Sequence, residues 1–159
     1  MQHRVAILMG SASDKPKMAP AAETLTKFGV GAEVRVLSAH RTPALVLEFA
    51  STARAEGYSA IICGAGMAAH LAGVVAAHTT LPVIGVPVSG GAIGGIDALY
   101  ATVQMPKGIP VATVAIDGSM NAALLALQII GVTDEEMTTK LAAHRVEMTA
   151  AAIAVDQEG

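Results

Sequence analysis

The chain has 159 residues, of which 53% are hydrophobic and 14% are charged, and its formal net charge at neutral pH is −3. The length suits one domain with a sizeable core, and the negative charge offers no basic patch to a nucleic-acid partner. No apolar run approaches the roughly 18 residues that span a bilayer, so we expect no membrane contact.

Cysteine usage and glycine content add further expectations. Cys63 is the single cysteine, which excludes an internal disulfide and is typical of a reducing cytoplasm. It ends an apolar run, so we expect a buried, inert thiol rather than a nucleophile. Residues 1–4 lack the layout of a signal peptide. The charge is low and the chain has 16 glycines, which indicates that other copies of the chain cover much of its surface. We therefore expect a homo-oligomer.

Five short runs of apolar or alternating residues predict strands, at 5–9, 32–37, 58–63, 81–87 and 110–116. Helical segments follow them, at about 15–28, 43–56, up to 78, 96–104 and 122–130, with a last helix at about 133–156. This alternation predicts an α/β fold, a three-layer flavodoxin-like parallel sheet of order 2-1-3-4-5 with an extra C-terminal helix. We expect one domain over residues 1–159, with its core at about 4–130 and its last helix packed on a neighbouring subunit.

Three helix starts carry recognisable signals. Pro20 does not suit the second turn of the first helix, so we expect that helix to be bent or to start late. Thr42 and Pro43 are typical of a cap and a first turn for the second helix. Residues 133–136 have the capping-box pattern for the last helix.

The turn after the first strand, residues 10–14, has the composition of a phosphate cradle. Gly10 lets the backbone approach a ligand, and Ser11 and Ser13 supply donors. The next helix points its positive dipole end at the same spot. The glycine-lysine pair of a Walker motif is absent, and Asp14 offers an alternative role as a helix cap.

The turn after the second strand, residues 38–43, combines three chemistries. Ser38 carries a hydroxyl, His40 can give and take protons near neutrality, and Arg41 presents a planar fork of donors for phosphate or carboxylate. The alternative is a capped turn with a surface cation. Because ligands of open α/β sheets bind at the carboxyl ends of the strands, a ligand site is favoured here.

The loop after the third strand begins with Gly64-Ala65-Gly66-Met67-Ala68-Ala69, which fits the pattern G-x-G-x-x-A. A dinucleotide site is disfavoured, because the motif follows the third strand and lacks an acidic residue at the end of the next one. Close packing of helix on strand, or backbone N–H groups that hold a carboxylate, are the alternatives. His70, in the first turn of the following helix, is either a second site histidine or a polar cap partner.

In the predicted strand order these three loops meet above one crevice. No group of histidine, cysteine and carboxylate side chains has the spacing of a metal site, and no G-x-S-x-G elbow is present.

Several motifs occur in one order along the chain. They are Met9-Gly10-Ser11-Ala12-Ser13-Asp14, Ser38-Ala39-His40-Arg41-Thr42-Pro43, Gly64-Ala65-Gly66 with Ala68-Ala69-His70-Leu71, Val103-Gln104-Met105-Pro106, and Asn121-Ala122-Ala123-Leu124-Leu125-Ala126. This combination, from about residue 4 to 130, closely resembles the bacterial N5-carboxyaminoimidazole ribonucleotide mutases of purine biosynthesis.

The resemblance implies a cytoplasmic isomerase that moves a carboxylate from N5 to C4 of the imidazole without cofactor or metal. It implies His40 as general acid and base, Ser11, Ser13 and Arg41 on the 5′-phosphate, and Asp14 on the ribose hydroxyls. Other substrate-binding residues are then Ser38, Ala39, Gly64, Ala65, Gly66, Met67, His70 and Leu71. It further implies a homo-octamer and coupling to the ATP-dependent carboxyaminoimidazole ribonucleotide synthase.

The chain departs from the usual pattern of these mutases at several places. Met67 stands where a small residue is normal, and Ala72 where proline is usual. The loop at 89–94 is unusually rich in glycine, and the turn at 117–120 is short. Lys15-Pro16 replaces a start of the first helix that contains tryptophan.

Three alternatives compete with the mutase. Direct carboxylation of aminoimidazole ribonucleotide is performed by related animal-type enzymes, which usually carry lysine after the histidine and an arginine-serine pair in the third loop. The carboxylase of nickel-pincer cofactor synthesis is suggested only faintly, by Gly66-Met67 and Gly90-Gly91. The third alternative is a non-catalytic nucleotide-binding module, in which His40 is dispensable.

Overall fold

The structure is a computed structural model that describes residues 3–158. The chain divides into two compact units, one that ends at Ala126 and one that begins at Leu127. Among the described residues, no helix combines the length and the apolar character needed to cross a bilayer.

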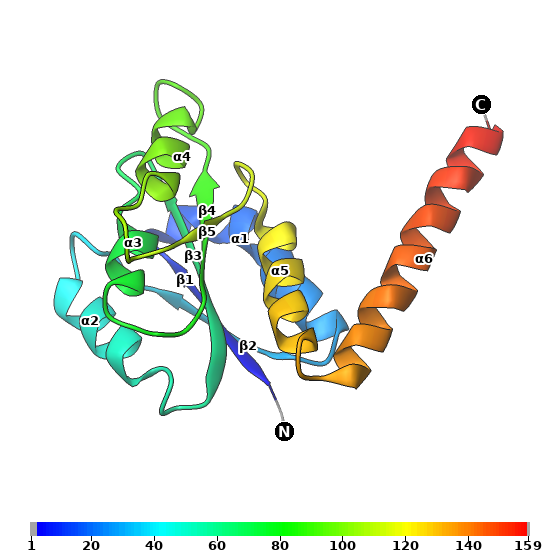
Figure 1. Cartoon of the computed structure of the whole chain (residues 1–159). Helices are drawn as coiled ribbons and strands as arrows, with labels where there is room; N and C mark the ends of the chain where they lie inside the picture. The colour runs from blue at the N-terminus through cyan, green and yellow to red at the C-terminus, as the bar shows by residue number, and fades with distance from the viewer. Residues whose placement is uncertain (1–2, 159) are drawn as a thin grey trace. The chain divides into compact units, whose positions relative to one another are not determined.

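The first unit is built on a five-stranded parallel sheet of order β2-β1-β3-β4-β5, which confirms the predicted fold (Figure 1). Its strands are β1 (Arg4–Met9), β2 (Gly31–Val36), β3 (Tyr58–Gly66), β4 (Val83–Val88) and β5 (Ala112–Thr113). The last residue of β1, Met9, pairs with Val36 of β2 and Gly64 of β3. The loops that follow these three strands therefore start side by side.

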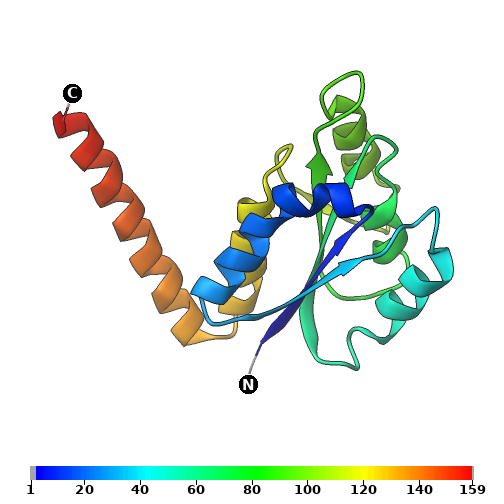
Figure 2. The same ribbon diagram turned by 180° about the vertical axis from the view of Figure 1, so that it is seen from behind.

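Helices lie on both faces of the sheet (Figure 2). They are α1 (Lys15–Lys27), preceded by a 3-10 turn (Ala12–Asp14), α2 (Pro43–Thr52), α3 (Leu71–Ala76), α4 (Ile96–Val103) and α5 (Ser119–Gly131). Helices α2 and α3 cover the face opposite α1. The first turn of α5 lies beside α1, where the Ser119 hydroxyl donates to the Lys17 carbonyl over 2.6 Å.

The core lies where β1, β3 and β4 are covered on both faces. Val5, Ile7 and Leu8 of β1 are fully buried, as is Ile62 of β3. This double coverage explains why these strands are continuous apolar runs rather than alternating ones. Cys63 belongs to this core, which confirms the expected burial, and this burial raises the pKa of its thiol.

Helix α2 ends at Thr52 rather than near 56, α5 begins at Ser119 rather than 122, and two strands differ clearly from their predicted lengths. β3 continues through Gly66, because Ala65 and Gly66 still pair with β4. β5 has only two residues, yet the segment after it follows β4, since the Val114 N–H donates to Gly85 and the Asp117 N–H to Pro87. Both differences in the strands arise from pairing with β4.

The helix starts also correct two expectations. α1 begins at Lys15 and continues through Pro20, so the expected late start is wrong. Pro20 lacks one N–H donor, which costs a single hydrogen bond near the start of a 13-residue helix. Thr42 occupies the position before α2 and Pro43 begins it, but the Thr42 side chain does not cap the helix.

The second unit contains the end of α5 and α6 (Glu135–Glu158). The Asp134 carboxylate accepts a 2.8 Å hydrogen bond from the Met137 N–H, so Asp134 caps α6. The expected capping box with Thr133 as its cap is therefore wrong, because the third residue of the helix is then Met137, whose side chain cannot bond back to the cap.

Candidate functional site

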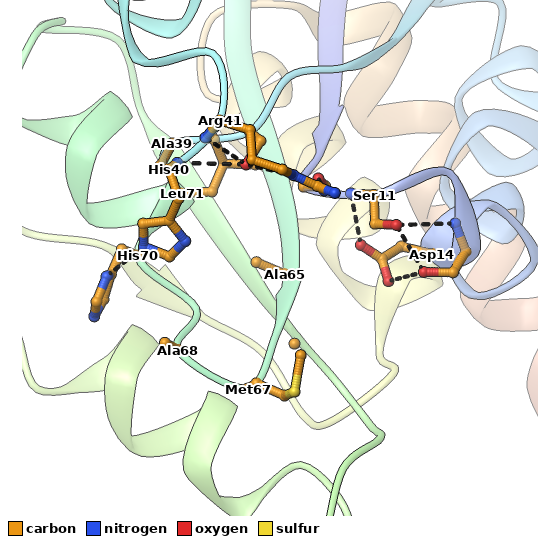
Figure 3. A pocket seen from close by; sticks show the side chains of 14 residues that line it. Ser11, Asp14, Ala39, His40, Arg41, Ala65, Met67, Ala68, His70 and Leu71 are labelled. Atoms are coloured by element: carbon orange, nitrogen blue, oxygen red, sulfur yellow. Dashed lines mark hydrogen bonds between the residues drawn. The ribbon is translucent and has the colours of Figure 1, made fainter.

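A cavity of about 360 Å³ opens at the carboxyl ends of β1, β2 and β3 (Figure 3). This is the edge of the sheet where open α/β folds bind ligands. The cavity is lined by Gly10, Ser11, Ser13, Asp14, Ser38, Ala39, His40, Arg41, Ala65, Gly66, Met67, Ala68, His70 and Leu71. It brings together every predicted site residue except Gly64.

Gly64 lies one step back from the cavity, in the part of β3 that packs on α1. A Cβ there would lie 2.4 Å from the Met18 sulfur, so the position needs glycine to let the helix approach. Gly10 and Ala68 line the cavity but were missing from the predicted set. Both belong to the predicted turns, and only the folded path of the chain shows that they face the cavity.

The turn after β1 is closed by its own polar groups. The Ser11 N–H donates to the Asp14 carboxylate over 3.1 Å, and the Ser11 hydroxyl accepts from the Ser13 N–H and hydroxyl. Asp14 precedes α1 without bonding its backbone, so it closes the turn rather than caps that helix. The result is a small ring of hydroxyl, N–H and carboxylate groups at the start of a helix. The Ser11 hydroxyl accepts two of these bonds and can still donate its own proton to an anion.

Arg41 connects the turn after β2 to the turn after β1. Its guanidinium donates to the Gly10 carbonyl over 2.6 Å and approaches the Ser38 hydroxyl at 3.4 Å. Figure 3 shows the side chain reaching toward Ser11. Because a guanidinium has five N–H donors in a planar fork, it can keep these contacts and still bind an anion beside Ser11.

Ser38 organises the second turn around itself. Its buried hydroxyl accepts from the N–H groups of His40 and Arg41 over 3.3 and 3.2 Å. The Thr42 hydroxyl accepts from the Ser38 N–H and donates to the Ser38 carbonyl. These contacts explain why Thr42 does not cap α2, and they fix the direction in which the His40 side chain leaves the turn.

His40 and His70 face each other in the cavity (Figure 3). The Nε2 of His40 lies 2.7 Å from the Nδ1 of His70, and the rings are almost perpendicular, at 86°. In such a bond one nitrogen donates and the other accepts, so the pair shares a single proton between these two atoms. His70 precedes α3 without a capping bond, which favours a site histidine over a polar cap partner.

The end of β3 has a different role from the one that G-x-G-x-x-A suggests. A Cβ at Gly66 would lie 3.1 Å from the Val88 carbonyl oxygen, so this glycine permits close pairing of β3 with β4. The glycines thus lie in a strand and not in a phosphate-binding turn. The next residue, Met67, has a positive φ of 51° and a side chain at the cavity wall.

No group of three metal-ligating side chains that could hold a metal ion occurs among the described residues. The side chains of the cavity offer anion binding by Ser11 and Arg41, and proton transfer by the paired imidazoles.

Known proteins match this chain along most of its length. The family model described as AIR carboxylase matches residues 4–151. The N5-carboxyaminoimidazole ribonucleotide mutase of Vibrio vulnificus is 55% identical over 153 residues, which is 95% of each chain. That of Pyrococcus abyssi is 54% identical over 91% of this chain and 83% of its own.

A second kind of relative is larger. The phosphoribosylaminoimidazole carboxylase of Candida albicans is 54% identical over 91% of this chain, which spans only 25% of that protein. Among solved structures, Treponema denticola PurE superposes with a TM-score of 0.89 at 30% identity, covering 99% of this chain and 98% of that one.

Proposed function

Since the chain belongs to the AIR carboxylase family, we propose that it is an N5-carboxyaminoimidazole ribonucleotide mutase, an isomerase of purine biosynthesis. The observation that carries the proposal is the cavity itself. It places an anion-binding turn with Arg41 at one end and the His40–His70 pair at the other. A phosphorylated nucleoside needs the first to bind its phosphate and the second to move protons at its base. The level of identity to the mutases of Vibrio vulnificus and Pyrococcus abyssi supports the same activity.

The substrate binds by its phosphate. The 5′-phosphate occupies the ring formed by Ser11 and Ser13 with the Arg41 guanidinium, and Asp14 accepts from the ribose hydroxyls. The other lining residues, from Ser38 and Ala39 to Leu71, shape the cavity around the base. The carboxylate sits where β3 ends, near Met67.

The reaction moves one carboxylate and one proton. The bond from N5 to the carboxyl carbon breaks as N5 gains a proton, which releases carbon dioxide and an electron-rich aminoimidazole. C4 then attacks carbon dioxide, and the C4 proton leaves. No electrons are lost or gained, so the steps need no redox partner. His40 gives the first proton and takes the second, and His70 holds its ring in the required tautomer.

Carbon dioxide has to stay beside C4 between the two steps. It is small and diffuses quickly, so retention requires a closed cavity in which proximity favours recapture. This requirement separates a mutase from a direct carboxylase, which takes carbon dioxide from solution.

Direct carboxylation is the second candidate, and the fungal relatives named phosphoribosylaminoimidazole carboxylase favour it. The deciding experiment supplies substrate labelled in its N5 carboxylate, with excess unlabelled bicarbonate. We expect the label to be kept in the C4 carboxylate. Product made mainly from bicarbonate would establish the carboxylase, and no conversion by either route would reject both activities.

His40→Asn tests whether the site is catalytic at all. Asparagine keeps polarity but cannot shuttle protons, so we expect turnover to fall by about 10²–10⁴-fold. Nucleotide binding, followed by calorimetry, should be largely kept because the phosphate contacts lie elsewhere. Unchanged turnover would instead support a non-catalytic nucleotide-binding module.

We also propose a cytoplasmic homo-octamer, which receives its labile substrate from the ATP-dependent synthase. The low charge of the chain and the exposed apolar side chains of β2 and α2 support burial against other copies.

A further inference from the structure

Lys17, Ser89 and Asp117 form a polar cluster outside the cavity. The Lys17 ammonium donates to the Ser89 carbonyl over 2.6 Å and to the Ser89 hydroxyl. The Asp117 carboxylate accepts from the Ser89 N–H over 2.8 Å and from its hydroxyl. These bonds tie Ser89 to α1 on one side and to the turn before α5 on the other.

Asp117 is held in an unusual backbone conformation. Its φ is 57°, a region that costs most side chains strain and that aspartate and asparagine tolerate better. Burial pushes the pKa of Asp117 upward, but the hydrogen bonds from Ser89 and the Lys17 ammonium outweigh it and lower the pKa. The carboxylate is therefore charged at neutral pH, and the cluster is intact there.

Ser89 begins the glycine-rich loop that the sequence singles out. Gly90, Gly91, Gly94 and Gly95 all have positive φ, so this loop takes its path without side chains to hold it. Its far end returns to its start, because a Cβ at Gly95 would lie 2.9 Å from the Ser89 Cα. Anchoring Ser89 therefore fixes both ends of the loop.

The middle of the loop packs against the cavity wall. A Cβ at Gly91 would lie 3.4 Å from the Met67 Cγ, so the Met67 side chain rests on the bare backbone of Gly91. The large side chain at 67 and the glycine at 91 are therefore complementary in size. Met67 lines the cavity at the end of β3.

We propose that Asp117 is a positioning residue which, through Ser89, seats the glycine-rich loop under Met67 and so holds Met67 as the wall that retains carbon dioxide. This inference rests on the proposed function. Asp117 is not among the residues that line the cavity, so in this proposal it acts through the loop and through Met67.

The test compares Asp117→Gly with the wild type in the labelled-carboxylate reaction. Glycine keeps the positive φ at low cost and removes the carboxylate. We expect exchange of the label with bicarbonate to rise at least about fivefold as the wall loosens. The KM for the nucleotide should stay within about twofold, since the phosphate contacts are untouched. Asp117→Asn, which keeps one acceptor oxygen, should lie between the two.

Met67→Gly, alone and combined with Asp117→Gly, tests whether Asp117 acts through Met67. If Asp117 acts through Met67, each single variant raises exchange and the double variant adds little to Met67→Gly. Additive effects, or wild-type exchange in Asp117→Gly, would overturn the proposal.

A structural readout keeps the test independent of turnover. Hydrogen exchange of the amides at 90–95 should accelerate at least about tenfold in Asp117→Gly, and the Met67 methyl resonance should sharpen. Failure of the wild type to convert the nucleotide would reject the proposed function, while unchanged hydrogen exchange in the variant would reject this inference separately.

Glu33→Gln is a matched control. It removes the ion pair between Arg4 and Glu33, whose side chains are 44% and 39% exposed, close to the 37% and 36% of Lys17 and Asp117. That pair lies at the opposite end of the strands, so we expect no change in label exchange. A rise equal to that of Asp117→Gly would mean that any lost ion pair loosens the cavity, which contradicts the proposal.

Discussion

Met67 has a left-handed backbone conformation, which glycine adopts more easily than any other residue. A left-handed φ costs a non-glycine residue about 1 kcal/mol or more, and here the residue that bears the cost also lines the cavity. Strain that persists at a site is typical of a position retained for its side chain rather than for stability.

Met67→Gly should therefore raise stability while it opens the cavity. Met67→Ala is the matched variant, because alanine loses the same side chain but keeps the strain. We expect the glycine variant to be more stable than the alanine variant by about 1 kcal/mol in urea unfolding. Equal stability of the two would show that the left-handed backbone costs nothing here.

The individual site residues show what can be predicted from sequence. His40, Arg41 and Ser11 follow strands whose order the alternation of strands and helices predicts, and parallel strands end at one edge, so their meeting is predictable. The bond between His40 and His70 is not, because it depends on the path of the chain after β3. The cluster around Ser89 is not either, since it joins segments that share no local pattern.

At the scale of elements, β4 approaches α4 through a glycine. A Cβ at Gly85 would lie 2.3 Å from the Thr102 Cγ2 and 3.0 Å from the Val111 Cγ1. Both neighbours are β-branched and stiff. The strand and the helix can keep their distance only while this position has no side chain.

Gly85→Ala should thus destabilise the protein by about 1–3 kcal/mol. Adding Thr102→Ser removes the clashing methyl group and keeps the hydroxyl that donates to the Ala98 carbonyl, so we expect partial recovery of the melting temperature. No recovery would place the clash elsewhere than on the Thr102 methyl group.

The phenol of Tyr58 connects the start of β3 to side chains of β1 and β2. Burial, together with the hydrogen bond to the Glu33 carboxylate and its charge, raises the pKa of Tyr58 to about 12. Arg4 lies 4.4 Å from the centre of the same ring and donates to Glu33. One ring thereby links β3 to both β1 and β2.

This raised pKa makes stability depend on alkaline pH. Below about pH 10 the phenol is neutral in both states and its contribution is complete. Between about pH 10 and 12 the unfolded chain loses the proton while the folded chain keeps it, so stability falls as the pH rises. Tyr58→Phe should flatten this part of the curve in thermal melts. An unchanged slope would show that other groups cause it.

Element boundaries were less predictable than element order. Gly64, Ala65 and Gly66 look like a loop because they have little strand propensity, yet pairing with β4 makes them the end of β3. β5 shows the reverse case, since its apolar run is longer than its regular pairing. Both outcomes depend on contacts with β4, which the local sequence does not encode.

At the scale of the whole molecule, large apolar side chains are exposed on β2 and α2. Val34 and Val36 of β2 are 47% and 43% exposed, and Leu45 and Leu47 of α2 are 48% and 45% exposed. Exposed apolar groups on an edge strand are a liability in a monomer. Their presence agrees with the proposed octamer.

Light scattering should accordingly give a mass eight times that of the 16.0 kDa chain. Val36→Lys places a charge on the edge strand, so we expect a smaller assembly from this variant. Lys27→Glu, a charge change on α1, is the control and should leave the mass unchanged. A monomeric wild type would contradict the octamer directly.

The buried thiol of Cys63 can report how often the core of this protein opens. Cys63 is the only cysteine in the sequence, and it lies in the central strand with its reactive thiolate suppressed. An alkylating reagent can therefore modify the native chain only when the sheet opens. The rate of labelling, followed by intact mass, measures how often the core opens. A tightly bound nucleotide would slow this labelling. No engineered reporter is needed to follow either event.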